Sequence, residues 1–449
     1  MRVTRPVSAL TAVTVVLLAT GCSASPSNPR PIVADGQIRL YGSDGVMSNS
    51  FGDALKGDPG VLAGMKGTAP LTPLTEDFKR RVKQVDPAVI DFNYAGEAYD
   101  AVIVAALAAE AAHSTDAGAL AKYIVAVTVG GSVCDSFKAC AQQLHSTGII
   151  RYQGVSSLRR SGFTDSGEPS TASYGTLNFG RDNHIDDAKT EFVGAGDAAG
   201  QARNPPPAVT VTGRTATPPP LKMGGLLPHT GELAGVGPPI FAGARLGVQE
   251  INDAGGVLGR PVEWLDGDDG TSPVTAAATV DRFIAAGVQV MIGAAASGIS
   301  AAVLPKAVAA GRVMISPSAT SDSLSTLDDK GLFFRTSPPD KLQARALADI
   351  LMRDGTAKVV IVARDDEYGI GLQRGVKADL TAAGIAAANI RLVPYPGKAT
   401  YDPGEQNTLF KPLATEIKRY RADAILIVGF AESAMLIRAL REVGVTFKS

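Results

Sequence analysis

Cysteine, histidine and aromatic residues are scarce in this chain of 449 residues. It has three cysteines, four histidines and one tryptophan, and its formal net charge is -1. The histidines are scattered, and none stands at the spacing that zinc ligands need. A nearly neutral chain with no long basic run offers nucleic acid no electrostatic footprint. These shortages argue against a zinc site and against a nucleic-acid partner.

Apolar runs long enough to cross a bilayer are also missing, including at the amino terminus. Arg2 and Arg5 precede an apolar run over Val7–Ala19, which is too short for a stable spanning helix. Thr-Gly-Cys follows, the pattern of a bacterial lipoprotein signal peptide with Cys22 as the lipidated residue. An ordinary cleaved signal peptide with a chance cysteine is the alternative. We predict a signal peptide and lipobox over residues 1–22 and an extracytoplasmic, membrane-anchored protein.

Residues 23–36 are rich in Ser, Pro, Asn and Ala, a composition that suits a solvated tether and not a packed core. With Cys22 assigned to lipid, Cys134 and Cys140 remain as a pair. In an oxidising compartment we expect them to form a small-loop disulfide. Two reduced, buried thiols are the alternative.

The composition is sufficient for a large core, since 45% of the residues are hydrophobic. At this length more than one domain is expected. From Met223 onward, short apolar runs alternate with segments of helical period, which predicts a parallel sheet covered on both faces. One helix includes Ile240 and Ile251 and ends near Gly255 and Gly256, which suit its carboxyl-terminal cap. The predicted strands are 224–227, 288–292, 359–363 and 424–428.

The amino-terminal half does not show this alternation of short apolar runs and helical segments. A helix with Tyr99, Ile103 and Leu107 on one stripe is expected. Two proline triplets between the halves predict a semi-rigid linker over residues 194–222, which separates regions 37–193 and 223–449. The elements expected in this half are strands at 38–41, 149–153 and 173–179 and helices near 74–86, 97–113 and 117–128.

Six blocks in residues 223–449 stand in a characteristic order. They are Leu227–Glu232, Ala242–Asn252, Ala254–Pro261, Ile315–Thr320, Phe334–Thr336 and Asp366–Gly371. Together they resemble the first portion of type I periplasmic binding proteins of the leucine/isoleucine/valine-binding family. The resemblance implies an α/β fold with two lobes, each a Rossmann-like parallel sheet, joined by a hinge. Residues 223–449 would supply the start of lobe 1 and most of lobe 2.

The amino-terminal half resembles the closing portion of the same family. The similar segments are Leu40–Gly45, Tyr94–Ala101, the Cys134/Cys140 pair and Gly167–Pro169 followed by Tyr174. In the usual order these segments would follow Val445. We therefore expect a circularly permuted chain whose usual ends are joined by the linker. The alternative is a broken tandem whose halves pair between chains.

A free amino acid presents a carboxylate and an ammonium on one carbon, so its site needs hydroxyl and N–H donors for one and a carboxylate for the other. The resemblance places Ser297, the backbone of Ser318 and Thr320 at the carboxylate-binding positions. Asp44 falls where the family pairs an acidic residue, often Glu, with the ammonium. Without the resemblance, the Ser and Thr residues would be ordinary helix caps and Asp44 a turn residue.

Aromatic residues complete the expected site. The resemblance places Tyr368 where a second-lobe aromatic closes over the ligand, and Phe430 and Tyr94 in loops that line the side-chain pocket. Tyr368 would otherwise be a packing residue at a helix start.

The resulting prediction is a solute-binding lipoprotein that binds an amino acid, of the branched-chain type, and passes it to the permease subunits of an ABC importer without a cofactor. No nucleophile elbow, zinc motif, phosphate loop or paired acid system stands at catalytic spacing, so an enzyme is not expected. A ligand-sensing receptor subunit, or a binder of amides or small organic acids, is the alternative, since the same cleft serves each of them.

Overall fold

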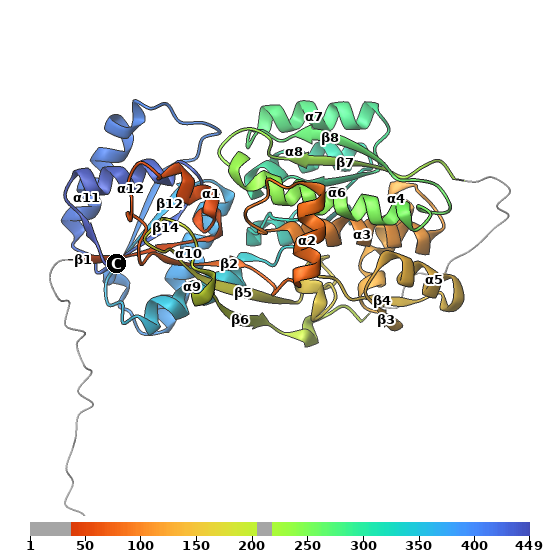
Figure 1. Ribbon diagram of the computed structural model, residues 1–449, viewed down its shortest axis with the longest axis horizontal. Helices are drawn as coiled ribbons and strands as arrows, with labels where there is room; N and C mark the ends of the chain where they lie inside the picture. The colour runs from red at the N-terminus through yellow and green to blue at the C-terminus, as the bar shows by residue number, and fades with distance from the viewer. Residues whose placement is uncertain (1–36, 204–217) are drawn as a thin grey trace, which may run out of the picture.

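The computed structural model describes residues 37–203 and 218–449. The predicted signal peptide, Cys22 and the tether lie outside the described residues, as do residues 204–217 of the predicted linker. Two α/β lobes lie side by side (Figure 1). The expected two-lobed α/β class with parallel sheets is therefore observed. Within the described ranges, no helix combines the length and apolar character that a membrane crossing requires.

The first lobe is built on a five-stranded sheet, in which all strands are parallel and follow the order β11-β10-β9-β7-β8. Alternate residues of β9 serve opposite faces: Val290 and Ile292 pack in one core, Met291 in the other. Burial on both faces explains why three of these strands read as continuous apolar runs. Their bounds are β7 (Lys222–Leu227), β8 (Glu263–Asp268), β9 (Val290–Gly293), β10 (Val313–Ser316) and β11 (Phe333–Arg335).

Both halves of the chain supply helices to this lobe. One face of the sheet packs in the same core as α3 and α6, and the other in the same core as α7 and α8. The expected one-sided stripe on α3 is wrong, because residues 95–111 are all buried. The elements are α2 (Glu76–Val85), α3 (Ala95–Ala112), α4 (Ala117–Ile124), α5 (Phe137–Thr147), α6 (Gly237–Asp253), α7 (Pro273–Ala285) and α8 (Ser297–Ala309), with the strand pair β3 (Ser132–Cys134) and β4 (Ile150–Tyr152).

The second lobe is built on an eight-stranded sheet in the order β13-β12-β14-β1-β2-β5-β6, with β15 also paired to β1. Its helices are α9 (Asp340–Arg353), α10 (Glu367–Ala382), α11 (Lys411–Tyr420), α12 (Ser433–Glu442) and the short α1 (Asn49–Ala54). Its strands are β1 (Gln37–Gly42), β2 (Lys66–Pro70), β5 (Thr171–Asn178), β6 (Glu191–Gly196), β12 (Val359–Asp365), β13 (Ile390–Pro396), β14 (Ala424–Val428) and β15 (Thr446–Phe447).

The two halves of the chain share this sheet. Strand β1 lies between β14 and β2, and Arg39 is paired in parallel with Ala424. At its start, Gln37 pairs with Thr446, and the Lys448 N–H donates to Ile38 at 2.9 Å. Gln37 and the last residues of the chain therefore lie together.

The linker is shorter than the sequence predicted. Gly194 and Gly196 belong to β6, which pairs antiparallel with β5. Ala202 is buried, and its N–H donates to the Phe163 carbonyl at 2.8 Å. Leu221 is fully buried just before β7 begins. The proline triplets suggested a linker from residue 194 onward, but backbone pairing with β5 makes the residues up to Gly196 part of the second lobe.

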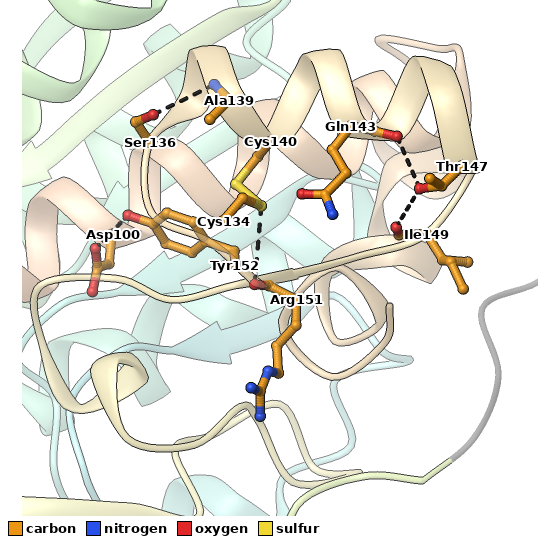
Figure 2. Close-up of a disulfide and its surroundings, with 10 residues drawn as sticks. All are labelled: Asp100, Cys134, Ser136, Ala139, Cys140, Gln143, Thr147, Ile149, Arg151 and Tyr152. Atoms are coloured by element: carbon orange, nitrogen blue, oxygen red, sulfur yellow. Dashed lines mark hydrogen bonds between the residues drawn. A yellow bond between two sulfur atoms is a disulfide. The ribbon is translucent and has the colours of Figure 1, made fainter. Parts of the chain in front are cut away.

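The expected disulfide between Cys134 and Cys140 is present, with Cα atoms 5.2 Å apart. It joins the end of β3 to the first turns of α5 (Figure 2). Ser136, between the two cysteines, caps α5 by accepting the Ala139 N–H. The bridge thus fixes one outer corner of the first lobe.

Candidate ligand-binding site

A pocket of about 440 Å³, counting its open mouth, lies between the two lobes. Its walls are loops that follow β9 and β10 in one lobe and β1, β12 and β14 in the other. These loops are at the carboxyl ends of parallel strands, where α/β folds place their ligands. All seven residues expected in the site line it, namely Asp44, Tyr94, Ser297, Ser318, Thr320, Tyr368 and Phe430.

The start of α8 forms the donor-rich wall. Ser297 is its first residue, and Ala296 before it makes no side-chain cap. The Ser297 hydroxyl accepts the backbone N–H groups of Thr320 and Ser321, both at 3.1 Å. Because it acts as acceptor in these bonds, its own proton remains for a pocket ligand. An uncapped helix start with a free hydroxyl proton suits a carboxylate.

Ser318 and Thr320 complete this wall. The Ser318 hydroxyl donates to the Ala295 carbonyl at 3.1 Å, so its side chain is used within the lobe. Its N–H makes only a long contact of 3.4 Å with the Ser316 hydroxyl. Thr320 is buried and lines the pocket. The structure therefore brings together the three residues expected to hold a carboxylate.

Buried groups behind the wall fix its shape. The Asp269 carboxylate accepts the Ala295 N–H at 3.0 Å and the Thr271 N–H at 2.8 Å, and burial raises the pKa of Asp269 to about 6. Gly293, at φ 133°, brings the chain so close to Leu226 that a Cβ would lie 1.9 Å from its carbonyl oxygen. Only glycine fits there.

Asp44 forms the acceptor wall in the opposite lobe, directly after β1. Its carboxylate accepts the Tyr94 hydroxyl at 2.5 Å, the Gln343 amide at 2.8 Å and the Tyr368 hydroxyl at 2.7 Å. Burial nevertheless raises the pKa of Asp44 above its usual range. Among the described residues, no ion pair joins it to a cation.

Tyr94 reaches Asp44 by an unusual backbone conformation. It precedes α3 with φ 61° and ψ 5°, in the left-handed region that large side chains rarely adopt. Such a conformation persists where the surrounding contacts determine it, and these residues cluster at functional sites. Here it directs the tyrosine hydroxyl into the pocket.

Tyr368 and Phe430 close the pocket as a stacked pair, with ring centroids 5.4 Å apart. The Arg364 guanidinium lies over the Phe430 ring, 4.3 Å from its centroid, and makes a cation–π contact with it. Arg364 is in turn 2.8 Å from Glu432, which also accepts the Tyr395 hydroxyl at 2.6 Å. The aromatic closure is thus held by a buried charged network.

Sequence reasoning missed several lining residues. Leu233, Val236 and Ile240 form an apolar wall before and within α6, and Asn93 adds an amide. The block after β7 was recognised as part of the resemblance, and its position at the carboxyl end of a strand could have marked Leu233 and Val236. Gln343 lies inside α9, and no sequence pattern distinguished it.

Comparison with known proteins agrees with this geometry. The family model described as periplasmic binding protein matches residues 220–449. The chain belongs to the periplasmic binding protein family. Relatives that it matches are named as Leu/Ile/Val-binding proteins.

Two relatives of this periplasmic binding protein are named for amino acids. Leu/Ile/Val-binding protein homolog 3 from Brucella melitensis is 29% identical over 228 residues, which are 50% of this chain and 58% of that protein. An amino acid binding protein from Pseudomonas aeruginosa is 30% identical over 224 residues, 49% of this chain and 56% of that protein. The chain thus spans somewhat more than half the length of these relatives.

Two solved structures are similar to part of the chain. A leucine-binding protein from Thermotoga maritima is 26% identical with a TM-score of 0.43, and the match covers 51% of this chain and 61% of that one. A branched-chain amino acid transporter substrate-binding protein from Streptococcus pneumoniae, in complex with isoleucine, is 26% identical with a TM-score of 0.42, covering 51% and 63%.

Proposed function

We propose that this periplasmic binding protein captures a free amino acid with an apolar side chain and delivers it to the permease subunits of an ABC importer. The observation that carries the proposal is the opposition of two walls in one pocket. A helix start with hydroxyl groups faces a buried carboxylate that has no cationic partner among the described residues. An α-amino acid carries a carboxylate and an ammonium that are complementary to these two walls.

Each part of such a ligand has a matching group. The α-carboxylate would lie at Ser297 and Thr320, and the ammonium at Asp44. The side chain would pack on Leu233, Val236 and Ile240, a wall without charge. This wall, and relatives named for leucine, isoleucine and valine, support the branched-chain type.

The two lobes would close on the ligand by a hinge, since each contributes part of its coordination. The closed form would then dock on the permease, with no chemical step. A sensing partner in place of a permease would use the same cleft. Small organic acids fit less well, because an acid that lacks an amine leaves the buried Asp44 uncompensated.

Two further proposals concern the chain as a whole. We propose that Cys22 carries a lipid anchor, supported by the apolar run and small residues before it.

We also propose that the order of the chain is a circular permutation of the family's order. The interleaving of both halves in one sheet supports an intramolecular permutant over a broken tandem.

A calorimetric and thermal-shift panel tests the ligand proposal. L-leucine, L-isoleucine and L-valine are expected to bind, and ligand at 100 times Kd adds about 2.7 kcal/mol to the free energy of unfolding. Two analogues serve as matched controls: 4-methylpentanoate lacks the ammonium, and leucinamide lacks the carboxylate. Equal binding of 4-methylpentanoate and leucine would contradict the assigned role of Asp44.

Substitution of Asp44 tests the same point from the protein side. Asp44→Asn keeps the size of the side chain but removes the charge that holds the ammonium, so leucine affinity is expected to fall by several kcal/mol. Asp349→Asn, on the exposed face of α9, is the control. Wild-type affinity in Asp44→Asn would remove this residue from the site.

A further inference from the structure

A second buried carboxyl group lies beside the ammonium end of the site. Asp340 is the first residue of α9 and is 1% exposed. Its N–H donates to the Thr320 carbonyl at 2.7 Å, which places it directly behind a residue of the pocket wall. Neither oxygen of its carboxyl group has a hydrogen-bond partner of good geometry. A buried polar group in this state needs an explanation.

Gln343 connects this carboxyl region to Asp44. It lies one turn after Asp340, and its amide nitrogen donates to Asp44 at 2.8 Å and to the Thr68 carbonyl at 3.1 Å. Its amide oxygen has no partner. The region between α9 and Asp44 therefore has an excess of acceptors over donors.

The surrounding groups provide little positive charge. Asp44 is faced by the hydroxyls of Tyr94 and Tyr368 and by Gln343. The titratable and polar groups that face Asp340 are Asp44, Thr320, Asp322, Tyr94, Tyr174, Tyr368 and Arg335. Arg335 is the single cation in this set, and Glu168 already holds it at 2.5 Å.

Both carboxyl groups consequently favour their protonated forms. Burial raises the pKa of Asp340 well above its usual range and the nearby Asp44 carboxyl raises it further, while the Thr320 side chain lowers it in part. Burial also raises the pKa of Asp44, while its hydrogen bonds from Tyr94, Tyr368 and Gln343 lower it. Two like charges in one dry region are not both ionised without a counter-charge.

We propose that Asp340 is a second acidic group of the ligand site, and that Asp44 and Asp340 together hold a proton which the ligand ammonium displaces to solvent. The ammonium brings one positive charge to a pair that otherwise gains neutrality only by protonation. The reaction is an exchange: the ammonium enters, and a proton leaves to the buffer. Asp340 acts through Thr320 and Asp44 and is a positioning residue.

This inference rests on the proposed function and adds a measurable property to it. Linkage requires that affinity rises with pH wherever binding releases protons. The logarithm of the ligand association constant is expected to rise with pH, with a slope of at most about one. The slope vanishes where Asp44 and Asp340 are both fully ionised. An amino acid binding site without such a pair has no slope near neutral pH.

The experiment is titration calorimetry of L-leucine into the full chain at pH 7, in phosphate and in Tris buffer. These buffers differ in ionisation enthalpy, so the difference in observed enthalpy counts the protons released. Release of a fraction of a proton, up to about one, is expected. Tight binding with no release overturns the proton inference and leaves the proposed function intact. Absence of binding to every amino acid of the panel overturns both.

Three variants test which carboxyl group holds the displaced proton. Asp340→Asn resembles the protonated side chain, so it is expected to bind leucine with proton release reduced toward zero and a flat pH profile. Asp349→Asn, exposed on the same helix, is expected to release protons as the wild type does. Glu232→Gln tests another carboxyl group whose pKa burial raises, to about 7, and is expected to retain the release. Loss of release in Glu232→Gln alone overturns the assignment to Asp340. If Asp340→Asn does not fold, absence of proton release in the wild type, or its loss in Glu232→Gln, still overturns the inference.

Discussion

Glu97 shows at the scale of one residue how burial controls protonation. It lies in the first turn of α3, among residues that are all buried. Burial, together with the nearby Asp100 carboxyl, raises the pKa of its carboxyl group from 4.5 to about 8. The folded protein therefore holds Glu97 protonated at neutral pH.

This shift predicts a stability change with pH. Between about pH 4.5 and pH 8 the unfolded chain loses the proton of Glu97 while the folded chain keeps it, so the free energy of unfolding falls across this window. Glu97→Gln removes this loss because glutamine resembles the protonated form. Its melting temperature, relative to wild type, is expected to rise from pH 4.5 to pH 8 and then level off. A difference that is constant with pH would contradict the assignment.

The residues of the site differ in whether their position can be predicted from the neighbouring sequence. Ser297, Thr320, Asp44, Tyr368 and Phe430 each follow a strand, and position after a strand can be read from a sequence. Asp340 and Gln343 reach the site only through the orientation of α9 against β2 and the pocket loops. That orientation is a property of packing, and no local pattern encodes it.

At the scale of elements, Glu168 and Arg335 join the two halves of the chain. Glu168 precedes β5, Arg335 ends β11, and both side chains are buried in an ion pair of 2.5 Å. Arg335 also donates to the Ser321 carbonyl at 2.7 Å and the Ala319 carbonyl at 3.3 Å. The pair therefore supports the loop that carries Thr320.

Breaking this pair is expected to be costly. Glu168→Ala leaves a buried guanidinium without its counter-charge, so the free energy of unfolding is expected to fall by about 3–5 kcal/mol. The double variant Glu168→Met with Arg335→Met removes both charges and is expected to recover much of this loss. Urea denaturation of both proteins measures the two values. Equal losses in the single and double variants would show that charge burial is not the cause.

The elements that the sequence predicted lie near their observed bounds, because long apolar or helical periods are local. Helices α2, α3 and α4 and strands β1, β4, β5, β12 and β14 lie within a few residues of expectation. Strands β2 and β6 were not predicted. Both are rich in small residues, and they become strands through their antiparallel pairing with β5.

At the scale of the molecule, the proposed permutation can be tested by restoring the family's order. A chain that begins at Met223, continues to Ser449 and passes through a short joint into residues 37–193 keeps every described sheet pairing except those of Lys222 and of the last residues of β6. It is expected to fold as a monomer and to bind the same ligand as the natural order. Loss of folding, or pairing only between two chains, would contradict an intramolecular permutant. Size-exclusion chromatography and calorimetry distinguish these outcomes.

The proposed lipid anchor is tested at Cys22. Cys22→Ser removes the thiol that would carry the lipid, so the protein is expected to leave the membrane fraction or remain as an unprocessed precursor. Acyl labelling and membrane partitioning measure this directly. Unchanged labelling would refute the lipobox, and Cys140→Ser, which leaves the signal region intact, is the control.

The central position of β1 has a consequence for how the chain acquires its structure. During synthesis β1 emerges first, yet one of its neighbours, β14, emerges near the end, and the Arg39–Ala424 pairing spans most of the chain. Loop-closure entropy must be overcome before such a distant contact forms, so high contact order slows folding. The sheet of the second lobe cannot be completed until β14 has been synthesised. Strand β1 must stay without this neighbour, and protected from aggregation, until then.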